Sequence, residues 1–278
     1  MKFTKWHGCG NDFVLVDAMR EECVVTADMA RKICDRHYGV GADGVLLLLP
    51  TDAADVKMKI INADGSEAEM CGNGIRCLAR YAYEAGYVKE AEFAVETGAG
   101  IMRPKIILSP DDTVSSVRVD MGEPILTGED IPVAEFGKRR VVAEPVEVDG
   151  ESFVMTCVSM GNPHCVIFVD DLTAFPVEQY GPKLERHSLF PRRTNVEFVQ
   201  VIDDSRLRMR VWERGAAVTL ACGTGACASL VAAVLNQKSQ RQVEITLDGG
   251  KLNIYWNEAD NHVYMTGAAA EVFSGEIK

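Results

Sequence analysis

Short apolar runs, β-branched or alternating with charged residues, recur along the chain and predict β-strands. Glycine, aspartate and asparagine separate these runs. Two longer stretches, 75–86 and 226–238, predict helices, and the second is apolar on nearly every side, as expected for a fully buried helix. The predicted strands are 13–17 (FVLVD), 45–49 (VLLLL), 56–62 (VKMKIIN), 93–97 (FAVET), 165–169 (CVIFV), 195–202 (NVEFVQVI), 207–213 (LRMRVWE) and 243–247 (VEITL).

Each predicted helix follows a similar tetrapeptide, CGNG at 71–74 and CGTG at 222–225, and the difference between 222 and 71 is 151. The same offset aligns GNDFVLVD (10–17) with GNPHCVIF (161–168), and VKMKIIN (56–62) with LRMRVWE (207–213). It also aligns Gly98 with Gly249. Several separated matches at one offset indicate an internal duplication, with halves near 1–122 and 152–267.

The predicted fold class is α/β (mixed α+β), with two pseudo-symmetric domains from that duplication. Each domain is expected to be a mixed β-sheet or barrel wrapped around a central helix, with the active site in the cleft between them. The N-terminal half is assigned to 1–122, completed by 268–278. The C-terminal half is assigned to 123–267 and includes the proline-containing crossover 123–151. A length of 278 residues suits two domains better than one.

Composition excludes several classes of protein. Forty-one acidic and 29 basic residues give a net charge of −12, which would repel a nucleic-acid backbone. No apolar run reaches membrane-spanning length and the N-terminal residues lack a signal-peptide core, so we expect a soluble cytoplasmic protein without a membrane partner. The nine cysteines contain no C-x-x-C pair, and their odd number argues against a secreted disulfide framework.

Cys71 and Cys222 are the candidate reactive residues because each stands at the start of a predicted helix. A helix N-terminus binds anions through its free N–H groups and is expected to lower the pKa of a thiol placed there. Two such thiols facing each other across a cleft could move a proton from one face of a carbon to the other. Amide groups at the helix starts would stabilise the charge developing on an adjacent carboxylate. The expected reaction is amino-acid inversion without a cofactor, by two thiols that titrate as a coupled pair.

The stretch NADGSEAEMCGNGIR (62–76) fits the signature N-x-D-G-S-x4-C-G-N-G-x-R at every specified position. HGCGNDFVLVD, GNPHCVIFVD, RTNVEFV, VWERG and ACGTGACA occur in the matching order, and over nearly its whole length the chain resembles the diaminopimelate epimerase family. The resemblance implies interconversion of LL- and meso-2,6-diaminopimelate without cofactor or metal, in the pathway to lysine and peptidoglycan. It also implies a homodimer.

The resemblance further implies roles for individual residues. Cys71 and Cys222 would be the acid/base pair, and the distal carboxylate would be held by Arg214 in a bidentate grip. His164 would support the site from beside the thiols. The substrate would be bound by the backbone amides of Gly72, Asn73, Gly223 and Thr224 at its reacting carboxylate, by Glu213 at its α-ammonium, and by Asn11, Asn62, Asn162, Asn195 and Arg214 at its amino and carboxylate groups.

Two alternatives stay open. A proline or hydroxyproline racemase-like enzyme also uses paired cysteines, but that branch typically has His where this chain has Asn73. A proline substrate would also leave Arg214 unpaired, which is costly if that side chain is buried. The second alternative is a non-enzymatic thiol redox protein in which Cys71 and Cys222 form a disulfide.

Three further motifs carry less weight. Gly44 departs from the Gln of some family members, and the offset pairs it with Asn195. The run GVGADG (39–44) fits G-x-G-x-x-G, but a helix-like stretch precedes it and a strand follows, the reverse of a dinucleotide-binding turn. The segment from Asp64 to Ser66 is expected to shape a turn rather than to contact substrate.

Overall fold

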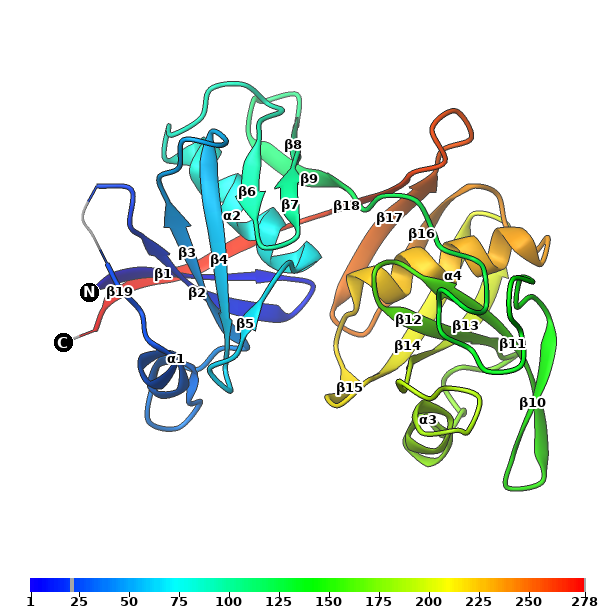
Figure 1. The fold of residues 1–278 in the computed structure, drawn as a ribbon. Helices are drawn as coiled ribbons and strands as arrows, with labels where there is room; N and C mark the ends of the chain where they lie inside the picture. The colour runs from blue at the N-terminus through cyan, green and yellow to red at the C-terminus, as the bar shows by residue number, and fades with distance from the viewer. Residues whose placement is uncertain (21–22, 278) are drawn as a thin grey trace. The chain divides into compact units, whose positions relative to one another are not determined.

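The structure is a computed structural model that describes residues 1–20 and 23–277. Its chain divides into two compact units, Met1–Asp120 with Thr266–Lys278 (unit 1) and Met121–Met265 (unit 2). Each unit combines one large sheet with two helices (Figure 1).

Unit 1 is built on a sheet whose strand order is β19-β1-β2-β3-β4-β6-β7, with β5 beside β4. The β2–β3 and β4–β6 pairs are parallel, and the other neighbours are antiparallel. β8 and β9 pair with each other in an antiparallel hairpin and do not belong to this strand order. The bounds are β1 (Lys2–Gly8), β2 (Asn11–Asp17), β3 (Gly44–Leu49), β4 (Val56–Asn62), β5 (Glu67–Ala68), β6 (Val95–Thr97), β7 (Gly100–Met102), β8 (Lys105–Leu108), β9 (Val114–Asp120) and β19 (Ala270–Glu276).

Helices pack on this sheet through apolar side chains. α2 (Gly72–Glu84) contacts β1 to β4 and the β8–β9 hairpin. α1 (Ala27–Cys34) begins at Thr26, whose hydroxyl accepts the N–H of Met29, and packs against β3 and β4. Because both helices cover β3, that strand is almost entirely buried, which explains why it reads as an unbroken apolar run rather than an alternating one.

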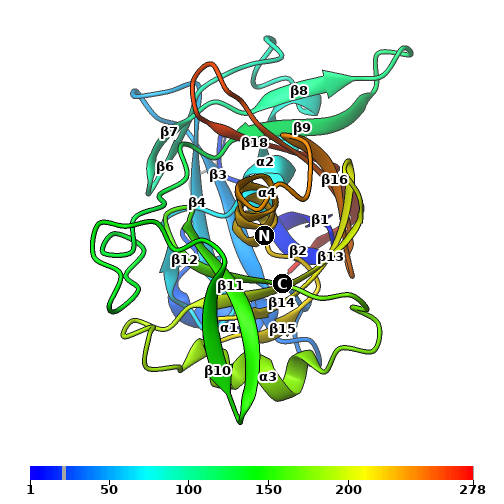
Figure 2. The ribbon, with the colours of Figure 1, turned by 90° about the vertical axis from the view of Figure 1, so that its right-hand side faces the viewer.

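Unit 2 contains a sheet with the order β10-β11-β12-β13-β14-β16-β17-β18, and β15 pairs with β14. α4 (Gly223–Leu235) contacts six of these strands, from β11 to β17, and Figure 2 looks nearly along it. Nine consecutive residues of α4, Gly225–Ala233, are buried, so the all-apolar stretch is a buried helix as predicted. The remaining bounds are α3 (Val177–Glu185), β10 (Glu144–Val148), β11 (Glu151–Ser159), β12 (Pro163–Phe168), β13 (Asn195–Asp203), β14 (Arg206–Glu213), β15 (Ala217–Thr219), β16 (Gln242–Leu247), β17 (Gly250–Trp256) and β18 (Val263–Gly267).

Strand register confirms the internal duplication. Phe13 pairs with Gly44 in unit 1, and their counterparts at an offset of 151, His164 and Asn195, pair in unit 2. The bounds of α2, shifted by 151, are those of α4. The order of parallel and antiparallel neighbours from β1 to β7 is also repeated from β11 to β17. The chain therefore uses one αβ framework twice.

Two expectations need correction. The offset falls to 150 after the helices, because Thr97 pairs with Gly100 in unit 1 while Leu247 pairs with Gly250 in unit 2. Gly249 therefore corresponds to Ala99, not Gly98, and both donate an N–H to equivalent carbonyls, those of Leu220 and Glu69. Nor does the part of the chain that the structure describes form a closed barrel: in unit 1 the strand order ends at β19 on one side and β7 on the other.

Candidate active site

Cys71 is the N-cap residue of α2. Its backbone is extended (φ −144°, ψ 120°), and its Sγ accepts the N–H of Gly74 at 3.4 Å, as an N-cap side chain does. The side chain is half-buried and its Sγ lies 3.7 Å from Oδ1 of Asn11, on β2. The sequence expectation of a cysteine at this helix start is confirmed.

Asn11 belongs to a hydrogen-bonded chain that fixes the start of α2. Its Oδ1 accepts from Nδ2 of Asn73 at 3.0 Å, and Oδ1 of Asn73 accepts from Nη2 of Arg76 at 2.9 Å. Arg76 is fully buried and also donates to the carbonyl of Gly72 at 3.1 Å. The side chain of Asn73 is thus committed to the protein. Arg76 received no role from sequence, although its place as the last residue of the signature marked it.

Asn62 and Ser66 enclose a turn beside this segment. Nδ2 of Asn62 donates to Oγ of Ser66 at 3.0 Å, and the N–H of Ser66 donates to Oδ1 of Asp64 at 2.8 Å. Gly65 has φ +84°, which favours glycine. The expected turn at 64–66 is confirmed, and Gly44 lies directly opposite Asn62 in the β3–β4 ladder.

Cys222 caps α4 in the same way. Its backbone is extended (φ −123°, ψ 110°), its Sγ accepts the N–H of Gly225 at 3.4 Å, and Oγ1 of Thr224 lies 3.5 Å away. Unlike Cys71, Cys222 is buried. The two candidate thiols therefore occupy equivalent backbone positions with different exposure.

A buried histidine–carboxylate pair accompanies Cys222. Nδ1 of His164 lies 2.7 Å from Oε1 of Glu197, and Nε2 of His164 lies 3.0 Å from Oδ1 of Asn162. Both side chains of the pair have 0% exposure. His164, Glu197 and Cys222 form one buried cluster, in which a side-chain nitrogen, oxygen or sulfur atom of each lies within 4.8 Å of the others.

The pKa of Cys222 is raised, not lowered as the sequence argument expected. Burial raises it most, and the negative charges of Glu213 and Glu197 raise it further. The hydrogen bonds with Thr224 and Gly225 act in the opposite direction but do not prevail. Desolvation and two carboxylates therefore outweigh the helix N-terminus, because a thiolate in a low-dielectric site beside negative charge is costly.

Neither α2 nor α4 has an acidic residue in its first turn, whereas α1 and α3 carry Asp28 and Glu178 there. The first N–H groups of a helix have no intrahelical acceptor, and the helix dipole favours negative charge beside them. The helix starts at Gly72–Asn73 and Gly223–Thr224 thus suit an external carboxylate.

The other proposed ligands of unit 2 lie near the end of β14. Oδ1 of Asn195 accepts the N–H of Arg214 at 2.9 Å, and its Nδ2 donates to the carbonyl of Pro163 at 2.9 Å. Oε1 of Glu213 accepts from Oγ1 of Thr219. Arg214 is exposed, so the cost of a buried, unpaired arginine, expected from the sequence for a proline substrate, does not arise in this structure.

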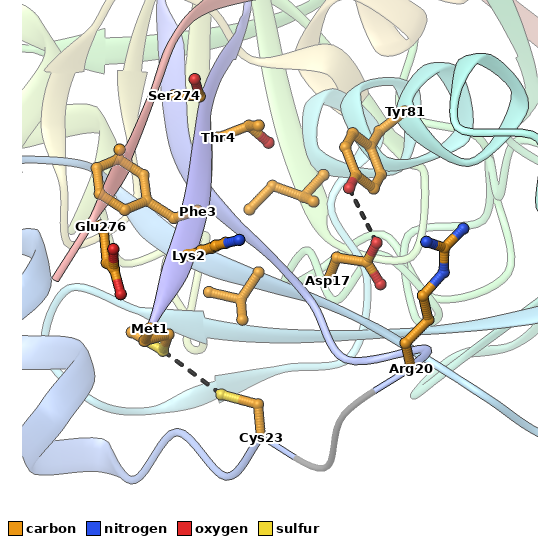
Figure 3. A pocket seen from close by; sticks show the side chains of 13 residues that line it. Met1, Lys2, Phe3, Thr4, Asp17, Arg20, Cys23, Tyr81, Ser274 and Glu276 are labelled. Carbon is orange, nitrogen blue, oxygen red and sulfur yellow. Dashed lines mark hydrogen bonds between the residues drawn. The ribbon is translucent and has the colours of Figure 1, made fainter.

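All nine cysteines lie within the described residues, and none of them forms a disulfide. A pocket in unit 1 lies apart from Cys71, between the β1–β2–β19 part of the sheet and Tyr81 of α2, whose hydroxyl donates to Asp17 at 3.0 Å (Figure 3). None of the predicted site residues lines this pocket.

Among residues 1–20 and 23–277, no helix combines the length and apolar character needed to cross a membrane.

Comparison with known proteins places the chain in one family. A family model described as diaminopimelate epimerase matches residues 3–127 and 156–272. A diaminopimelate epimerase of Moorella thermoacetica is 57% identical over 280 residues, covering 100% of this chain and 99% of that protein. Another, of Acetivibrio thermocellus, is 53% identical over 277 residues, covering 100% and 98%.

Solved structures share the fold at low sequence identity. A phenazine biosynthesis protein of the PhzF family from Bacillus anthracis matches with a TM-score of 0.72 at 16% identity, covering 100% of this chain and 99% of the other. A probable proline racemase from Agrobacterium radiobacter matches with a TM-score of 0.68 at 17% identity, covering 100% and 92%. The framework thus supports more than one chemistry; on sequence, the chain belongs to the diaminopimelate epimerase family.

Proposed function

We propose that the protein is a diaminopimelate epimerase, an isomerase that interconverts LL- and meso-2,6-diaminopimelate. Family membership supports the reaction, and one structural observation supports its mechanism: two cysteines cap the two duplicated helices. Cys71 and Cys222 act as the acid/base pair. A thiolate on one face takes the α-proton, and a thiol on the other face returns a proton to the α-carbon.

The charge that develops in this step lies on the α-carboxylate, which takes enolate character. In our proposal the first amides of α2 and α4, at Gly72, Asn73, Gly223 and Thr224, hold this group. The absence of acidic residues from both first turns supports that role. Donors already oriented toward the developing charge contribute more than donors that must reorganise during the reaction.

The remaining proposed contacts concern the rest of the substrate. Glu213 receives the α-ammonium, and the exposed guanidinium of Arg214 binds the distal carboxylate through paired N–H groups. His164 supports Cys222. Asn11, Asn62, Asn162 and Asn195 complete the binding set, and Asn11 is supported in this by its 3.7 Å separation from the Cys71 sulfur.

Deuterium incorporation tests this function. The protein is incubated with LL-diaminopimelate in deuterated water, and we expect deuterium at one α-carbon together with formation of the meso isomer. Cys71→Ala and Cys222→Ala should each abolish turnover. Cys23→Ala is the matched control because Cys23 is also half-buried but caps no helix. Full turnover in either capping-cysteine variant would refute the two-base mechanism, and exchange into proline instead would favour the racemase alternative.

Assembly and location form part of the same proposal. We propose a cytoplasmic homodimer. Nine cysteines without a disulfide are consistent with a reducing compartment. An exposed edge strand supports self-association, because β19 carries Val272 and Phe273 at 56% and 47% exposure. Sedimentation velocity should give twice the chain mass, and fractionation of the cells should recover the protein with cytoplasmic markers. A monomer, or recovery with the membrane fraction, would refute these two points.

A further inference from the structure

The duplicated framework carries different side chains beside its two cysteines. At the offset of 151, His164 and Glu197 of unit 2 correspond to Phe13 and Leu46 of unit 1. A Cβ atom added at Gly74 would lie 3.1 Å from Leu46 and 3.6 Å from Phe13. Apolar side chains thus lie beside Gly74 at the start of α2, whereas an ionisable pair occupies the equivalent space at the start of α4.

Glu197 and the Cys222 sulfur flank the same glycine. A Cβ added at Gly225 would lie 2.7 Å from Oε1 of Glu197 and 3.2 Å from Sγ of Cys222. The carboxylate has no exposure. Its Oε1 contacts His164, and its Oε2 has no hydrogen-bond partner among the residues that the structure describes. A carboxylate so poorly compensated acts strongly on a second negative charge nearby.

The ionisable groups that act on Cys222 come from three strands packed against α4. Glu213 on β14 and Glu197 on β13 are negative and disfavour a thiolate, after the larger effect of burial. His164 on β12 is held between Glu197 and Asn162. Because Glu213 is a proposed substrate ligand, Glu197 is the residue whose charge serves no evident binding purpose.

We propose that Glu197 is a positioning residue, which fixes His164 and keeps Cys222 as the neutral thiol between turnovers. Between turnovers Cys222 is then the protonated proton donor, and Cys71, beside Leu46 and Phe13, is the base. The two cysteines of the duplicated framework therefore differ in their resting protonation state. The catalytic consequence rests on the proposed acid/base function, but the effect of Glu197 on the thiol does not.

Alkylation of Cys222 tests the effect on the thiol without turnover. Iodoacetamide labelling of the full chain is followed by peptide mass spectrometry across neutral and alkaline pH, in a Cys71→Ala background that removes the other capping thiol. Glu197→Gln should move the labelling midpoint of Cys222 to lower pH by about one unit or more, because a nearby negative charge is lost. Glu185→Gln is the matched control: Glu185 is buried in the same unit, but bonds Trp212 at 2.8 Å.

Glu197→Leu provides a second variant, since unit 1 carries Leu46 at the same place in the framework. It should move the midpoint in the same direction, so the test stands if the glutamine variant folds poorly. Unshifted midpoints in folded Glu197→Gln or Glu197→Leu would overturn the proposal, as would an equal shift in Glu185→Gln. Failure of the epimerase assignment would appear instead in the deuterium assay and leave the labelling result intact.

In the otherwise native enzyme the same variants separate positioning from a merely structural role. The kcat/KM pH profiles for LL- and meso-diaminopimelate report the free-enzyme form that each substrate requires. We expect the two profiles to differ in the parent and to approach each other in Glu197→Gln. Profiles that change only in height, with the same pH dependence, would contradict the proposed role.

Discussion

The paired glycines at the third helical position of α2 and α4 give a comparison in which the backbone is held constant. Alanine at Gly74 or Gly225 adds one methyl group at equivalent points of the duplicated framework. Neither glycine has a positive φ, so alanine is tolerated by the backbone at both. Replacing such a glycine stabilises a protein by about 0.4–1 kcal/mol through the unfolded state. Any difference between the two variants therefore reports what the methyl group meets.

At Gly74 the methyl group meets the Leu46 Cδ2 atom at 3.1 Å and the Cys71 Cβ atom at 3.5 Å. A leucine methyl group can yield by a few tenths of an ångström, so the unfolding free energy of Gly74→Ala should lie within about 1 kcal/mol of the parent value. At Gly225 the methyl group meets Oε1 of Glu197 at 2.7 Å and Sγ of Cys222 at 3.2 Å.

Glu197 cannot move aside freely, because it is buried and its Oε1 is hydrogen-bonded to Nδ1 of His164 at 2.7 Å. Loss of a hydrogen bond to a charged group costs about 1.5–3 kcal/mol, and overpacking typically adds about 1–3 kcal/mol. After the backbone gain is subtracted, Gly225→Ala should destabilise the protein by about 2 kcal/mol or more. It should also lower turnover more than Gly74→Ala, because it displaces the groups around Cys222.

Urea unfolding of the parent and both variants measures the effect, with circular dichroism confirming that each variant is folded in buffer. The midpoint of Gly225→Ala should fall clearly below that of Gly74→Ala. Two variants of equal stability, within about 0.5 kcal/mol, would show that Glu197 yields easily and would refute the crowded geometry at Gly225.

Three further predictions concern groups away from the two cysteines. Burial raises the pKa of Cys34 to about 11. The protonated thiol contributes stability below the unfolded pKa near 8.5, and this stability is lost as pH rises toward 11, by about 1.4 kcal/mol per pH unit. Cys34→Ala should therefore flatten the alkaline limb of a plot of unfolding free energy, measured in urea, against pH. Burial opposes ionisation of Asp12, but hydrogen bonds from Arg36 and Lys5 prevail and lower its pKa to about 2. The stability that the Asp12 carboxylate contributes is present above about pH 4 and is lost as pH falls toward 2. Asp12→Asn should therefore flatten the acid limb of the same plot, and an unchanged acid limb would contradict this prediction. Arg76→Met should lower the unfolding free energy by about 2–4 kcal/mol, because the buried guanidinium no longer donates to Oδ1 of Asn73 and to the carbonyl of Gly72. Calorimetry checks this, and a loss below about 1 kcal/mol would mean that solvent replaces the guanidinium.

The backbone features of the fold could largely be predicted from the sequence. Repetition at one offset located both helices and both capping cysteines, because equivalent turns require similar glycine and asparagine patterns. The isolated Gly98–Gly249 match was wrong, because glycine occurs in many turns and a single match at 151 is then uninformative. The β6–β7 and β16–β17 registers show that the offset has fallen by one residue there. A repeat can be aligned reliably where several neighbouring residues match, but not from a single glycine.

Side-chain environments were less predictable. Glu197 was missed because it stands in a strand whose neighbours read as an ordinary buried run, and only its alignment with Leu46 marks the position as unusual. The raised pKa of Cys222 depends on burial and on carboxylates from β13 and β14, which no local pattern contains. The exposure of Arg214 likewise follows from where the strand ends in space. Electrostatics of this kind arises from tertiary neighbours and requires the structure.

The pairing of β19 with β1 has a consequence for biosynthesis. β19 follows all of unit 2 in the chain, so the ribosome makes the entire second unit before the first can complete its sheet. Until then β1 offers an open row of backbone donors and acceptors to any neighbouring nascent chain. Unit 2, being contiguous, can fold during this wait. Translation thus sets an order of maturation in which the earlier-made half is finished last, and premature release would leave its β1 edge uncovered.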